Sequence, residues 1–188
     1  VLTAHKSIAL PGCSINNPTL TEADLKNLAV AKQYKVTDVM LPFVRNKADL
    51  IILREALKEN NCEDIRIFAK IENMTGVEHL EELIPYCDYI VIARGDLGNA
   101  MPLSKLPRVQ AHIAQVCREH KKDFMVVTQM LDSMIRNPYP TRAEVNDIYH
   151  AVTQGAKALM LTGETAHGKY PVEAMKMLVD TAKESKNI

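Results

Sequence analysis

The stretch Ile-Arg-Ile-Phe-Ala-Lys-Ile-Glu-Asn, residues 65–73, is a β-type apolar run that ends in a lysine and a glutamate two residues apart. Side chains of a strand alternate between its two faces. Lys70 and Glu72 are therefore predicted to point the same way, while Ile71 faces the apolar packing behind them. A cation and a carboxylate would then share one surface at the carboxyl end of a strand.

Two later apolar runs also end in polar residues that can carry chemistry. The run 89–93 is followed by Arg94-Gly95-Asp96, and the run 124–127 is followed by Thr128-Gln129. In parallel α/β folds the ligand binds outside the carboxyl ends of the strands. The repeated pattern therefore predicts a functional site where these ends meet.

Short apolar runs alternate with amphipathic runs along the chain, which predicts an α/β fold with five parallel β/α units. The strands are expected at 39–44, 65–69, 89–93, 124–127 and 158–161, and the helices at 21–34, 46–60, 77–84, 102–120 and 171–186. A doubly wound sheet is the alternative, but residues 45–48 after the first strand contain no glycine for a phosphate loop. Polar residues at the ends of consecutive strands favour part of a (β/α)8 TIM-type barrel.

The composition argues against several classes of protein. Lys and Arg balance Asp and Glu at 23 each, and no basic run is interleaved with aromatic residues, so no nucleic-acid partner is expected. No apolar run approaches the roughly 20 residues that span a bilayer. The four cysteines form no Cys-x-x-Cys pair, and the six histidines form no zinc motif. We therefore expect a soluble, cytoplasmic protein with no membrane partner.

Glu72 and Asp96 form the metal hypothesis, because Mg²⁺ binds one or two protein carboxylates and completes its shell with water and anionic substrate oxygens. The alternative is a pair of solvated acids, or a Glu72 side chain that is ion-paired with Lys70. Lys70 beside a cation would stabilise a phosphoryl group or an enolate oxygen, and a surface lysine is the alternative. Gly95 would let backbone N–H groups approach a ligand. Thr128 could relay a proton or have a structural role.

Six motifs, in order and spread over nearly the whole chain, closely resemble those of the pyruvate kinase family. They are Leu10–Gly12, Ala69–Asn73, Ala93–Gly98, Thr128–Leu131, Pro140–Glu144 and Leu161–Ala166. The resemblance implies that residues 1–188 are a single segment of a catalytic TIM-barrel domain, covering barrel strands four to eight. It also implies that 1–18 are the exit from an inserted domain and a linker, and that 19–188 are a helix followed by five β/α units.

The resemblance further implies phosphoryl transfer from phosphoenolpyruvate to ADP, giving pyruvate and ATP. Lys70 would then stabilise the transfer, and Glu72 and Asp96 would hold Mg²⁺ or Mn²⁺. Gly95 and Asp96 would receive the substrate carboxylate through backbone N–H groups, and Thr128 would lie near the carbon that is protonated. A homo-oligomer, a tetramer in the family, is the implied assembly.

The family's first barrel strands supply an arginine for the phosphate and the ligands of K⁺, and this sequence does not contain them. We therefore expect the 188 residues alone to lack measurable kinase activity, since substrates would miss part of their positioning shell. Robust turnover by the purified chain would refute this expectation.

Two other functions stay open at this point. One is a magnesium-dependent aldolase or lyase that forms a pyruvate enolate, against which the Lys70 and Thr128 motifs argue. The other is a non-catalytic barrel fragment or interaction module, whose open sheet edges would bind a partner or a second copy. Phosphate transfer from phosphoenolpyruvate would distinguish the first, and a concentration-dependent mass without ligand binding would favour the second.

Overall fold

The computed structural model describes residues 17–186. The expectations for residues 1–16, including the turn at Leu10–Gly12, lie outside the described residues. The described chain contains a parallel sheet. Its strands are β1 Asp38–Leu41, β2 Arg66–Ile71, β3 Tyr89–Ala93, β4 Asp123–Val127 and β5 Ala158–Met160.

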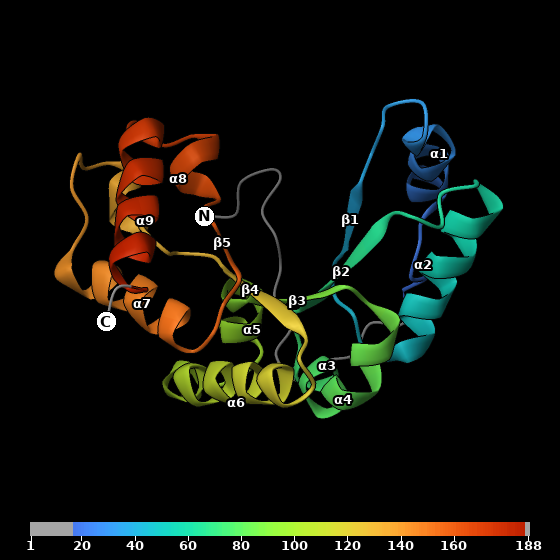
Figure 1. The fold of residues 1–188 in the computed structure, drawn as a ribbon, viewed down its shortest axis with the longest axis horizontal. Helices are drawn as coiled ribbons and strands as arrows, with labels where there is room; N and C mark the ends of the chain where they lie inside the picture. The colour runs from blue at the N-terminus through green and yellow to red at the C-terminus, as the bar shows by residue number, and fades with distance from the viewer. Residues whose placement is uncertain (1–16, 187–188) are drawn as a thin grey trace, which may run out of the picture.

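The strands lie in the sheet in the order in which they occur in the sequence, β1-β2-β3-β4-β5, and each neighbouring pair is parallel. A doubly wound sheet reverses its strand order at a switch point, whereas a barrel adds each new strand beside the last. The consecutive order therefore confirms the α/β fold built from five parallel strands and favours the barrel arrangement over the doubly wound one. In Figure 1 the sheet is curved, and the helices follow the outer side of the curve.

Helical segments connect the strands. They are α1 Glu22–Ala31, α2 Lys47–Glu59, α3 Met74–Glu78, α4 Leu80–Leu83, η1 Ile84–Tyr86, α5 Arg94–Asn99, η2 Leu103–Lys105, α6 Leu106–Glu119, η3 Asp132–Ile135, α7 Arg142–Thr153, α8 Gly163–Ala166 and α9 Pro171–Glu184. Thr21 is the N-cap of α1: its side chain accepts from the Asp24 N–H, and the Asp24 carboxylate accepts from the Thr21 N–H. This reciprocal pair is a capping box, which satisfies two N–H groups that a helix start otherwise leaves without partners.

The two faces of the sheet have different roles. Along β2, Ile67, Ala69 and Ile71 are fully buried in the main core between the sheet and the helices. Phe68 and Lys70 point to the opposite face, where a smaller apolar cluster lies on the inner side of the curve. That cluster consists of Val91, Ala93 and Val127 with Phe68, Met125 and Met160 packed against them. Lys70, at the carboxyl end of β2, lies on the same face as this cluster.

Several element boundaries differ from those predicted. The first strand ends at Leu41 instead of residue 44, because Pro42 follows it and Phe43 has a positive φ of 52°. The helix expected at 77–84 begins earlier, at Met74, because Asn73 caps it through the Gly76 N–H. The α6 helix begins at Leu106, later than predicted, after the single turn η2.

Candidate functional site

Lys70 and Glu72 are in direct contact at the carboxyl end of β2. The Lys70 Nζ lies 2.7 Å from Glu72 Oε1, and the side chains are 24% and 1% exposed respectively. The strand's alternation brings them to the same face, while Ile71 between them is buried among the helices. The ion pair foreseen as the structural alternative is therefore present, and its lysine remains partly accessible to a ligand.

The second Glu72 oxygen is bound by the loop that follows β1. Oε2 accepts a 2.7 Å hydrogen bond from the Phe43 backbone N–H, and the Val44 N–H donates to the Lys70 carbonyl. Phe43 has a positive φ of 52°. A buried carboxylate requires such partners, so the neighbouring strand end orients Glu72. Each carboxylate oxygen has about two acceptor positions, so both can still take a further partner.

Gly95 and Thr128 meet at the ends of β3 and β4. A Cβ placed on Gly95 would lie 2.9 Å from the Thr128 Cγ2, a distance that real Cβ atoms essentially never adopt. The absence of a side chain at Gly95 is therefore what allows Thr128 to lie against α5. These two residues, 33 positions apart in the sequence, belong to one local surface.

Asp96 lies in the first turn of α5, on the strand end next to that of Glu72. Asp96 is exposed, and none of the ion pairs among residues 17–186 involves its carboxylate. The helix begins at Arg94, and its N-cap residue Ala93 makes no side-chain hydrogen bond. The first N–H groups of a helix have no partners within it, so those of α5 are available to water or a ligand.

The segment after β4 has an unusual backbone. Thr128 has a φ of 82° and Gln129 a φ of 54°, both in the left-handed region. A β-branched residue with positive φ is an outlier that costs about 1–3 kcal/mol and persists only where surrounding contacts impose it. The contacts that surround this turn therefore determine where the Thr128 side chain lies.

Glu164, from the end of β5, supports the same segment. This buried carboxylate accepts from the Leu131 N–H at 3.0 Å and from the Thr162 N–H at 2.8 Å. Burial by itself would raise the pKa of Glu164, but hydrogen bonds from backbone N–H groups outweigh it and lower the pKa below its ordinary value of 4.5. Within the segment 162–166, the Thr162 N–H is therefore bound by the chain's own Glu164 carboxylate.

Arg94 was not predicted from the sequence as a site residue, yet its guanidinium lies within this group. Nε and Nη2 donate to the Thr128 carbonyl at 3.2 and 2.7 Å, and Nη1 lies 2.6 Å from Asp147 Oδ2 on α7. One available signal was its position, since a cation in the first turn of a helix is unfavourable for the helix dipole. Such a residue is expected to make its contacts outside that helix.

The donor set fits a hard divalent cation, which binds carboxylate oxygens. Within the part of the chain that the structure describes, no group of three or more His, Cys, Asp or Glu side chains could hold a metal ion. Glu72 and Asp96 could therefore supply at most two carboxylates from the described residues. Two carboxylates with the remaining positions taken by water and substrate is the arrangement that Mg²⁺ usually adopts in phosphoryl-transfer enzymes.

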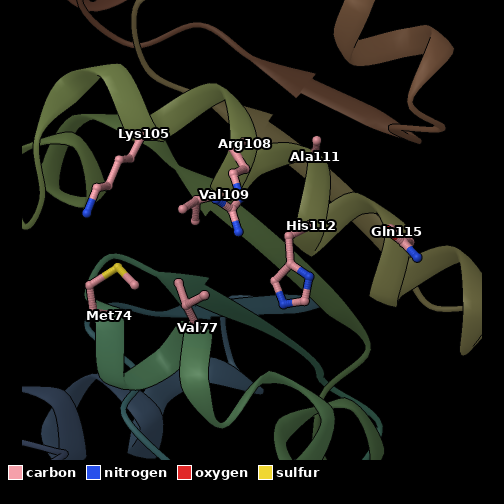
Figure 2. A pocket seen from close by; sticks show the side chains of 8 residues that line it. All are labelled: Met74, Val77, Lys105, Arg108, Val109, Ala111, His112 and Gln115. Carbon is pink, nitrogen blue, oxygen red and sulfur yellow. The ribbon is translucent and has the colours of Figure 1, made fainter.

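A groove of about 650 Å³ lies elsewhere, between α3 and α6 (Figure 2). Figure 2 shows Arg108 and His112 pointing from α6 toward Met74 and Val77 on α3. Met74 and Val77 also pack against the core between the sheet and the helices. The groove therefore belongs to the outer helical layer, whereas Lys70 and Glu72 lie at the opposite face of the sheet.

Comparisons with known proteins agree on one family. Residues 1–175 match a family model described as "Pyruvate kinase, barrel domain". A pyruvate kinase from Clostridium acetobutylicum is 41% identical over 184 residues, which is 98% of this chain and 39% of that protein. One from Bacillus licheniformis is 41% identical, covering 98% of this chain and 32% of that protein, and one from Borreliella burgdorferi is 42% identical, covering 95% and 37%.

The chain therefore spans less than two fifths of the length of these relatives. A search of the described residues for a helix of the length and apolar character needed to cross a membrane finds none.

Proposed function

Since the chain belongs to the pyruvate kinase family, we propose that its residues take part in phosphoryl transfer from phosphoenolpyruvate to ADP. The observation that carries the proposal is the set of polar residues at the carboxyl ends of three consecutive parallel strands. Lys70 and Glu72 end β2, Gly95 and Asp96 follow β3, and Thr128 follows β4. Active sites of barrel enzymes are built at this end of the strands.

Lys70 is proposed to be the group that neutralises charge on the phosphate. Its ammonium already lies against the Glu72 carboxylate, which fixes the position of its flexible stem. A fixed cation of this kind stabilises the negative charge that develops on the transferred phosphoryl group and costs no reorganisation during the reaction.

Glu72 and Asp96 would hold Mg²⁺ or Mn²⁺. When bound, such a cation neutralises charge on phosphate and enolate oxygens. The Phe43 N–H and Lys70 keep the Glu72 carboxylate oriented whether or not a cation is present.

Gly95 and Asp96 are proposed to bind the substrate carboxylate through their backbone N–H groups. The start of α5 at Arg94 supports this role, because N–H groups of the first helical turn have no partners within the helix. Thr128 lies against Gly95, so a carboxylate bound at α5 would bring its neighbouring carbon close to the Thr128 hydroxyl. That hydroxyl can donate or accept a proton, which suits the protonation of enolpyruvate to pyruvate.

Calorimetric titration of Mn²⁺ into the purified chain, with oxalate as a mimic of enolpyruvate, tests the proposal. We expect binding that depends on oxalate, and we expect its loss in Glu72→Ala and in Asp96→Asn. Glu55→Gln is the matched control, because Glu55 is an exposed acid on α2. Circular dichroism verifies that each variant is folded. A folded wild-type chain that binds no Mn²⁺ and oxalate, or equal binding by all variants, would contradict the proposal.

A further inference from the structure

We infer that Arg94 is a positioning residue, which holds the segment 128–130 so that the Thr128 side chain stays against Gly95. The guanidinium donates twice to the Thr128 carbonyl, at 3.2 and 2.7 Å, and its Nη2 lies 3.0 Å from the Met130 sulfur. Its contacts therefore lie within the strained Thr128–Gln129 turn, at the Thr128 carbonyl, and directly after it, at Met130. The effect on ligand binding rests on the proposed function, whereas the effect on the turn does not.

The backbone geometry explains why the turn needs this support. Positive φ values at Thr128 and Gln129 are disfavoured for residues with a side chain, and most of all for a β-branched one. Left to its local preferences, the turn would relax to negative φ and move the Thr128 side chain away from Gly95. A charge-assisted pair of hydrogen bonds to the Thr128 carbonyl opposes that relaxation more strongly than a neutral pair would.

The Asp147 carboxylate keeps the Arg94 guanidinium in its orientation. Arg94 Nη1 lies 2.6 Å from Asp147 Oδ2, and the Arg94 side chain is only 12% exposed. Asp147 belongs to α7, which packs against α9. The pair therefore transmits the position of the outer helix α7 to the turn that carries Thr128.

The placement of Arg94 supports a role in the site over a role in its own helix. A cation in the first turn is unfavourable for α5 through the helix dipole, so α5 gains nothing from this charge. The Arg94 side chain instead reaches the neighbouring strand end, 34 residues along the chain. Glu164 holds the same segment from the other side through the Leu131 N–H, so the β4 turn is held from both adjacent strand ends.

Two measurements on Arg94→Met test the inference. Hydrogen exchange followed by mass spectrometry should show exchange about tenfold faster or more in peptides covering 128–131, with little change in other segments, since the loss removes charged hydrogen bonds to that turn. The affinity for oxalate at saturating Mn²⁺ should fall by about tenfold or more, while the affinity for Mn²⁺ alone should stay within about twofold. A residue that only stabilised the fold would change neither measurement selectively.

Three further variants are compared with Arg94→Met. Arg94→Lys keeps the charge without the forked donor, so it should recover part of the oxalate affinity. Asp147→Asn should weaken oxalate binding less than Arg94→Met does, because the bonds to the Thr128 carbonyl remain. Arg108→Met is the matched control, an exposed arginine on α6 that takes part in no ion pair among the described residues, and it should behave as wild type.

The outcomes separate this inference from the proposed function. Unchanged exchange at 128–131 in Arg94→Met would overturn the inference, and so would faster exchange with undiminished oxalate affinity. If the folded wild-type chain binds no oxalate, the proposed function fails. In that case faster local exchange in Arg94→Met still supports the positioning of the turn, and unchanged exchange overturns it.

Discussion

At the scale of single residues, Glu72 has two different partners for its two oxygens. One oxygen forms an ion pair with Lys70 and the other accepts a hydrogen bond from the Phe43 N–H, and the side chain is almost fully buried. In Glu72→Gln only one oxygen remains as an acceptor, so one of the two donors loses its partner. We expect the free energy of unfolding to fall by about 1–3 kcal/mol, measured by urea denaturation.

Glu55→Gln serves as the control for that loss, because it makes the same chemical change at an exposed position on α2. Its free energy of unfolding should stay within about 0.5 kcal/mol of wild type. Equal stabilities for the two variants would show that the buried contacts of Glu72 contribute nothing to the fold.

The lowered pKa of Glu164 makes the stability of the fold depend on pH. Its pKa is lowered below 4.5 in the folded protein, so its contribution to stability is complete above that pH and is lost as the pH falls through the lowered value. Glu164→Gln should therefore be less stable than wild type at pH 7, by about 1–3 kcal/mol. The difference in Tm between the two proteins should shrink below about pH 4.5. A difference in Tm that stays constant from pH 7 to pH 3 would contradict this account.

At the scale of elements, the short helix α5 contains two glycines with different surroundings. A Cβ on Gly95 would lie 2.9 Å from the Thr128 Cγ2, whereas a Cβ on Gly98 would meet Leu103 and Leu106 at the ordinary distances of 3.4 and 3.5 Å. Alanine favours a helix over glycine by about 1 kcal/mol at either position. Gly98→Ala should therefore keep or raise Tm and retain oxalate binding.

Gly95→Ala should remain folded but lose oxalate affinity by about tenfold or more, because Thr128 is displaced from its place against α5. Calorimetric titration of oxalate at saturating Mn²⁺ measures both variants under the same conditions. Equal affinities in Gly95→Ala and Gly98→Ala would show that the contact between α5 and Thr128 does not shape the site.

At the scale of the whole molecule, the sheet has two edge strands. Among the described residues β1 and β5 each pair with one neighbour only, and Met40 on β1 is 38% exposed. Unpaired strand edges favour association with another chain. We expect the sedimentation coefficient of the purified chain to rise with protein concentration, and Met40→Lys to reduce that rise.

Ile52→Lys is the control for the edge, because Ile52 is an equally exposed apolar residue, at 43%, on the helix α2. It should leave the concentration dependence unchanged. If both lysine variants reduce association alike, then general surface hydrophobicity and not the strand edge is the cause.

The alternation of strands and helices was predictable from the sequence, because apolar periodicity and capping residues act over a few neighbouring positions. The run at 89–93 matches β3, and Thr21, where the first helix was predicted to begin, caps α1. The end of the first strand was wrong because a distant group intervened. The first strand stops at Leu41, and the next N–H after Pro42, that of Phe43, donates to Glu72 instead of continuing the sheet.

The sequence by itself determined which chemically capable residues follow the strands, since Lys70, Glu72, Gly95, Asp96 and Thr128 all stand directly after apolar runs. Only the tertiary structure decided which of them touch. The Phe43 bond to Glu72 joins residues 29 apart and the Arg94 bond to Thr128 joins residues 34 apart. Such contacts depend on the order of the strands in the sheet and on a strained turn, and local patterns in a chain do not encode either one, because both arise from packing between distant segments.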